Sequence, residues 1–134
     1  MIFVDTSAFL ARYLSRDQRH KDAVQGWKAL AQRSWKCYTS NFVLDETFTL
    51  LARRSSYSFA ADRARSLYAS ASLEIVRPSN EDELEALALF EKFADQDVSF
   101  TDCVSFALMK RHVVRRAFAF DRHFRDAGFE LWPR

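Results

Sequence analysis

The chain has 134 residues, the length of a single domain, and its 49% hydrophobic and 28% charged residues exclude a disordered chain. A net charge of +2 is too small to identify a nucleic-acid binder. No apolar run approaches the ~20 residues of a membrane helix, and the opening MIFVDTSAFL lacks the basic segment of a signal peptide. Cys37 and Cys103 lack metal-ligand spacing, so we expect reduced thiols in a cytoplasmic protein. Because no apolar run is long enough to cross a membrane, we expect no membrane partner.

Short apolar runs alternate with segments of helical periodicity, and no linker or repeat separates them. In chain order we predict a strand at 2–5, helices at 7–14 and 19–33, a strand at 35–39, helices at 41–54 and 58–71, a strand at 73–76, helices at 81–97 and 102–112, a strand at 117–120, a helix at 122–127 and a strand at 129–132. This alternation favours one α/β domain, residues 1–134, with a mostly parallel sheet and helices on both faces.

The helix predicted at 81–97 carries much of the acidic charge. Residues 78–100 hold one basic and seven acidic residues, whereas the segments before and after them are basic. Asn80 is the predicted cap, and the predicted buried stripe consists of Leu84, Leu87, Ala88 and Phe93. The acidic side chains then form a solvated face, and the basic segments are candidates for phosphate contacts.

Two aspartates stand at the ends of predicted strands. Asp5 ends the first strand, and Asp121 follows the fourth. Sites in parallel α/β sheets form at the carboxyl ends of the strands, where an unpaired buried charge is costly. Each aspartate taken alone is explained equally well as the N-cap of the helix that follows it.

Two further acids extend this pattern. Glu46 interrupts the apolar run of the helix at 41–54, and Asp102 stands at the start of the helix at 102–112. Each one alone is explained as well by an exposed helix position or by the helix dipole. Converging carboxylates without Cys or His ligands select hard cations such as Mg²⁺ or Mn²⁺, which serve phosphodiester chemistry. Asp45 points about 100° away from Glu46, and Asp97 is interpreted as a surface loop residue.

Three segments resemble those of PIN domains, and the third is similar to VapC-type PIN proteins nearly throughout. They are VDTSAFL at 4–10, TSNFVLDET at 39–47 and SFTDCVSFALMKRHVVRRAFAFDRHFRDAGF at 99–129. The resemblance implies a three-layer α/β/α sandwich and a metal site formed by Asp5, Glu46, Asp102 and Asp121, with Ser7 bonded to a metal ligand or its water. It also implies a homodimer and a cognate antitoxin that places a basic side chain at the acidic site.

The same resemblance implies the toxin of a toxin–antitoxin pair. Such a protein is a metal-dependent endoribonuclease that cleaves RNA by attack of water activated by Mg²⁺, or by Mn²⁺ as its substitute. Arg53, two helical turns after Glu46, and Arg122 are the predicted substrate contacts at the rim of the site. His123 is interpreted as structural, although histidine is a common general base.

Two alternatives stay open. A catalytically silent PIN scaffold would only bind RNA or protein, but a scaffold has no reason to keep four clustered acids. A phosphatase of the haloacid dehalogenase type would resemble an Asp-x-Asp motif after the first strand, whereas Asp5 is followed by Thr6 and Ser7. Turnover of a small phosphomonoester distinguishes that phosphatase from a nuclease.

Overall fold

Five parallel strands form the centre of the computed structural model, which describes all residues from 1 to 134. The strands are β1 (Ile2–Val4), β2 (Cys37–Ser40), β3 (Leu73–Val76), β4 (Arg116–Phe118) and β5 (Glu130–Trp132), and their order in the sheet is β3-β2-β1-β4-β5. Every pair of neighbouring strands is parallel, which confirms the predicted sheet. All three residues of the central strand β1 are buried, as expected for a strand covered on both faces.

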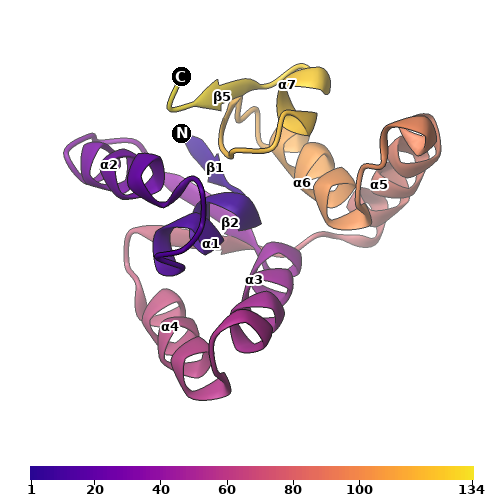
Figure 1. Cartoon of the computed structure of the whole chain (residues 1–134). Helices are drawn as coiled ribbons and strands as arrows, with labels where there is room; N and C mark the ends of the chain where they lie inside the picture. The colour runs from indigo at the N-terminus through magenta and orange to yellow at the C-terminus, as the bar shows by residue number, and fades with distance from the viewer.

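Seven helices cover the sheet: α1 (Thr6–Tyr13), α2 (His20–Ala31), α3 (Asn41–Arg54), α4 (Tyr57–Ala69), α5 (Asn80–Lys92), α6 (Phe100–Arg111) and α7 (His123–Asp126). Crossovers between parallel strands are right-handed, so the direction of each crossover decides which face its helices cover. The chain moves one way from β1 to β3 and back from β3 to β5, which puts α1–α4 on one face and α5–α7 on the other (Figure 1). This arrangement is the predicted three-layer α/β/α sandwich. None of the helices has both the length and the apolar character needed to cross a membrane.

The direction of the crossovers reverses at the junction of β1 and β4, where Val4 pairs with Phe118. The helices that follow these two strands leave the sheet toward opposite faces. In open α/β sheets, ligands bind in the crevice outside the carboxyl ends of the strands at such a switch point. The topology therefore brings Asp5 and Asp121, which follow these strands closely, to the place where a site is expected.

Aromatic packing holds β4 in position. The fully buried ring of Phe118 contacts Trp27 on α2 and Trp132 on β5, with ring centroids 5.0 and 5.1 Å apart. Helix α2 comes close to this ring because it carries Gly26, where an added Cβ would lie 2.9 Å from Cζ of Phe118. The ladder ends at Phe118, two residues earlier than predicted, so Asp121 lies on a short connection rather than on the strand itself.

The buried face of α5 differs from the predicted one. Leu84 and Leu87 belong to the predicted stripe but are 57% and 45% exposed, and Ala88 is exposed as well. The buried residues are Asp82 and Ala86, one helical turn apart. The small side chain of Ala86 suits the contact with α6, and the charged Asp82 is tolerated there because it is paired.

The pairing of Asp82 joins α5 to α6. One carboxylate oxygen accepts a hydrogen bond from Nε of Arg111 at 2.8 Å, and the other accepts one from the backbone N–H of Ser79 at 2.9 Å. The Ser79 hydroxyl in turn accepts from the backbone N–H of Asp82 at 3.2 Å, which completes a capping box. Ser79 therefore caps α5 in place of the predicted Asn80, and Ser99 caps α6 at the residue before Phe100.

We expect Asp82→Ala to lower the free energy of unfolding by about 1–3 kcal/mol, because it removes the capping box and leaves Arg111 without its partner. Urea denaturation followed by circular dichroism measures this change. Glu83→Ala, on the exposed side of the same turn, is the control, and its effect should stay within about 0.5 kcal/mol. Equal effects of the two substitutions would contradict a stabilising role for the Asp82 contacts.

Candidate metal centre

Asp5 is buried at the carboxyl end of β1 and is 3% exposed. Its backbone N–H donates to the carbonyl oxygen of Phe118 at 3.0 Å, which continues the contact between β1 and β4. One carboxylate oxygen, Oδ2, caps α1 by accepting from the backbone N–H of Ser7 at 3.2 Å. The other, Oδ1, is buried and has no hydrogen-bond partner. The capping role expected as an alternative is therefore real, but it uses only one of the two oxygens.

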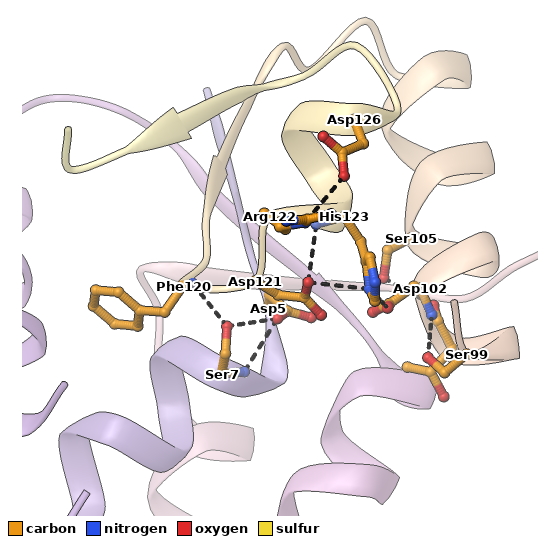
Figure 2. A network of polar contacts seen from close by, with 11 residues as sticks. Asp5, Ser7, Ser99, Asp102, Ser105, Phe120, Asp121, Arg122, His123 and Asp126 are labelled. Carbon is orange, nitrogen blue, oxygen red and sulfur yellow. Dashed lines mark hydrogen bonds and ion pairs between the residues drawn. The ribbon is translucent and has the colours of Figure 1, made fainter. Parts of the chain in front are cut away.

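Ser7 connects the ends of the two central strands. Its hydroxyl donates to Oδ2 of Asp5 at 2.7 Å and accepts from the backbone N–H of Phe120 at 3.0 Å (Figure 2). Phe120 directly precedes Asp121, so this single hydroxyl fixes the position of Asp5 relative to the connection that carries Asp121. The expected bond of Ser7 to an acid of the cluster is present in the structure.

Asp102 and Asp121 reach the same point from two other elements. Asp102 lies in the first turn of α6 and is 6% exposed, and its backbone N–H donates to the hydroxyl of the cap Ser99 at 3.0 Å. Asp121 follows β4, and its Oδ1 accepts from the backbone N–H of His123 at 2.9 Å. Figure 2 shows the side chains of Asp5, Asp102 and Asp121 directed toward one another.

His123 joins this group of acids. Its ring nitrogen Nδ1 lies 3.0 Å from Oδ1 of Asp121 and 3.5 Å from Oδ2 of Asp102. Sequence analysis interpreted His123 as structural, so this residue was missed as part of the cluster. The available signal was its position two residues after Asp121, because an aspartate often accepts from the backbone N–H two residues later and thereby fixes that residue beside it.

The acids raise one another's proton affinity. Burial, followed by the charge of Asp102, raises the pKa of Asp5 to about 7, although the hydrogen bonds from Ser7 oppose the rise and Asp121 adds to it. Burial, followed by the charges of Asp121 and Glu46, raises the pKa of Asp102 to about 6, and His123 opposes that rise. Asp5, Glu46, Asp102 and Asp121 are therefore close enough to act on one another electrostatically.

The neighbouring acids occupy different environments. Glu46 is half-buried on α3, whereas the adjacent Asp45 is exposed, as expected for residues about 100° apart around a helix. Asp97 is exposed and ends the short turn after α5 with a φ of 57° in the left-handed region. Of Asp45, Glu46 and Asp97, only Glu46 raises the pKa of Asp102.

The two predicted substrate arginines lie outside the cluster. Arg122 follows Asp121, but its side chain is 78% exposed and reaches Oδ2 of Asp126 at 3.5 Å. Arg53 is exposed in the last turn of α3 and lines a shallow hollow with Phe48 and Tyr57. Neither arginine neutralises the carboxylates in the structure, so the cluster has no arginine or lysine partner among its own contacts.

The donors of the cluster fit a divalent cation. Asp5 is 3% exposed and directs the unpartnered Oδ1 into a group of carboxylates, a costly arrangement for a protein that binds no cation there. Ligand atoms of Asp102, Asp121 and His123 all lie within 4.8 Å of one another. The candidate ligands are thus Asp5, Asp102 and Asp121, with Glu46 and His123 beside them.

A group of buried acids at the switch point of a parallel five-stranded α/β/α sandwich defines a class of protein. The PIN domain family model matches residues 2–130, so this chain belongs to the PIN domain family. The chain is also 36% identical, over 96% of its length and 95% of the relative's, to the 23S rRNA-specific endonuclease VapC20 of Mycobacterium tuberculosis. A VapC ribonuclease of Archaeoglobus fulgidus is 30% identical over 76% of the chain and 65% of the relative.

Solved structures agree with this assignment. The crystal structure of Mycobacterium tuberculosis VapC20, described as a sarcin-ricin loop cleaving toxin, superposes with a TM-score of 0.87 at 34% identity and covers 96% of both chains. VapBC2 from Rickettsia felis, bound to a promoter DNA fragment, superposes with a TM-score of 0.72 at 12% identity over 98% of this chain and 97% of the other. The second similarity shows the shared fold alone.

We expect the stability of the metal-free protein to fall as the pH rises from about 4 to about 7. A buried carboxyl with a pKa of about 7, against its ordinary 3.8, keeps its proton in the folded state over an interval in which the unfolded chain has lost it. The folded state therefore binds more protons there, and the loss across the interval should be roughly 2–4 kcal/mol.

Urea denaturation in EDTA between pH 4.5 and 8 measures this dependence. Asp5→Asn should flatten the curve and give a more stable protein at pH 8, because the buried charge is gone. Curves of the parent and the variant that stay parallel would show that Asp5 is not the buried acid responsible.

We expect Ser7→Ala to destabilise the fold by about 1–3 kcal/mol, because the backbone N–H of Phe120 and the carboxylate of Asp5 both lose a hydrogen bond. Thermal unfolding of the metal-free protein measures the effect. Ser58→Ala, an exposed serine on α4, is the control and should change little. A Ser7 variant as stable as this control would refute the role of the hydroxyl in joining β1 to β4.

Proposed function

We propose that the chain is a metal-dependent endoribonuclease of the VapC type, the toxin of a toxin–antitoxin pair. The observation that carries the proposal is the buried group of carboxylates at the switch point of the sheet, with an unpartnered oxygen on Asp5. The named relatives are a 23S rRNA-specific endonuclease and a VapC ribonuclease, which supports RNA as the substrate.

The proposed catalytic residues and metal ligands are Asp5, Glu46, Asp102 and Asp121. Carboxylate oxygens suit Mg²⁺, with Mn²⁺ as its substitute. A bound ion of this kind offsets the mutual repulsion of the acids, lowers the pKa of a coordinated water and neutralises charge at the phosphate. Ser7 supports the site by orienting Asp5, and its second hydrogen bond to Phe120 keeps the Asp121 connection in register.

Basic side chains must accompany an acidic site that accepts a polyanion. We assign this role to Arg122 and Arg53 as rim contacts. Arg122 is next to Asp121 and its only close acid, Asp126, is 3.5 Å away on the surface, so the guanidinium is free to exchange that partner for a phosphate. Arg53 lies about 10 Å along α3 from Glu46, so it would contact the RNA further from the cleaved bond.

A second copy of the chain and an antitoxin are the proposed protein partners. Leu84, Leu87 and Phe90 lie three residues apart on α5 and are 57%, 45% and 43% exposed. Such a row of apolar side chains supports a homodimer contact on this helix. The uncompensated acids around Asp102 support an antitoxin that inserts a basic side chain into the site, as the resemblance to VapC proteins implies.

The decisive experiment is RNA cleavage by the purified chain with Mg²⁺, with Mn²⁺ and with EDTA. The RNA substrates are 23S rRNA and a synthetic hairpin of the sarcin-ricin loop, since a relative acts on that loop. We expect cleavage only with metal. Asp102→Asn should lower the rate at least about 100-fold, because even the outer partners of metal ligands are worth 10–100-fold.

Asp97→Asn is the matched control. It makes the same chemical change at an exposed acid outside the cluster, in a left-handed conformation that asparagine tolerates. It should leave the rate unchanged. A folded, metal-loaded parent that binds these RNAs without cutting them would favour a binding scaffold over a nuclease.

A further inference from the structure

A backbone hydrogen bond of His123 fixes the position of its ring beside the acids. The backbone N–H of this residue donates to Oδ1 of Asp121 at 2.9 Å, and the ring then lies against the same oxygen. The side chain is 23% exposed, and the buried part of the ring is Nδ1. The ring therefore directs this nitrogen toward Asp121 and Asp102 (Figure 2).

Nδ1 lies within ion-pair distance of two carboxylates. It is 3.0 Å from Oδ1 of Asp121 and 3.5 Å from Oδ2 of Asp102, and ligand atoms of these three residues all lie within 4.8 Å of one another. In the tautomer that carries its proton on Nε2, Nδ1 presents a lone pair beside two carboxylates. A cation between the three side chains would satisfy all of them at once.

Asp5 provides a second, independent observation on the same space. It lies between β1 and α1, is 3% exposed, and has a buried Oδ1 without a partner. Asp5 and His123 thus belong to different elements, and both side chains face the same group of acids (Figure 2).

We propose that Nδ1 of His123 is a metal ligand beside Asp102 and Asp121, and that it raises the affinity of the site for Mn²⁺ relative to Mg²⁺ above the ratio that the carboxylates alone would give. The inference rests on the proposed function, because it concerns the same metal centre. Mg²⁺ is bound in proteins almost entirely by oxygen, whereas imidazole nitrogen suits transition metals, whose affinity for such sites rises along the series that begins with Mn²⁺. A nitrogen donor therefore changes the choice of metal and not merely the strength of binding.

The test is Mn²⁺ binding by the intact chain, followed by pulsed electron paramagnetic resonance and by calorimetric titration with Mn²⁺ and Mg²⁺. We expect the ¹⁴N modulation of a directly coordinated imidazole in the parent. His123→Gln should abolish the modulation and lower the ratio of Mn²⁺ to Mg²⁺ affinity by about 10-fold or more. Gln keeps a polar side chain of similar reach but offers oxygen as its ligand atom.

His112→Gln is the matched control, since this histidine follows the far end of α6, about 15 Å along the helix from Asp102, and stacks on Tyr38. It should keep both the modulation and the selectivity. Bound Mn²⁺ without ¹⁴N modulation in the parent, or modulation that persists in His123→Gln, would overturn the inference.

The outcomes also separate this inference from the proposed function. RNA cleavage by a parent whose Mn²⁺ shows no coordinated nitrogen would refute the role of His123 and keep the nuclease. A coordinated nitrogen in a parent that cuts no RNA would keep the role of His123 and refute the nuclease. A folded parent that binds neither metal would refute the ligand role directly.

Discussion

The burial of several carboxylates at one end of a parallel sheet is the constraint on which the rest of this structure depends. Asp5 reaches that point because β1 is central and fully covered, and Asp121 reaches it because β4 pairs with β1. The crossovers reverse direction between these strands, at the point where the side chains meet. Burial and mutual repulsion raise the pKa of Asp5 and Asp102, so ionising both carboxyls is costly without a proton or a cation between them.

The same polar groups serve the fold and the site. Asp5 caps α1 with one oxygen and leaves the other unpartnered, and Ser7 orients Asp5 while it holds the backbone of Phe120. Helix caps and turns are fixed by short, local hydrogen bonds, so the capping role of Asp5 holds its side chain in place. The structure confirms that Asp5 caps α1, and its second oxygen stays available for the proposed metal.

Contacts outside the acidic cluster hold the helix that carries Asp102 in position. Helix α6 carries Asp102 in its first turn, and the contact of Arg111 with Asp82 joins this helix to α5. The buried face of α5 carries Asp82 in place of the leucines that the hydrophobic pattern assigned to it, and Leu84 and Leu87 are exposed. A hydrophobic pattern identifies a helix well. Which face of the helix is buried depends on the element that the helix packs against.

The sequence alone determined the succession of strands and helices along the chain, the parallel sheet and the α/β/α architecture, because these follow from local periodicity and from a family resemblance along the whole chain. It also singled out Asp5, Glu46, Asp102 and Asp121, four acids whose charges act on one another in the structure. Only the tertiary structure decided the strand order, the buried face of α5 and the position of the His123 ring among the acids. Those features depend on contacts between residues far apart in the chain, and no local pattern encodes which distant partner a side chain meets.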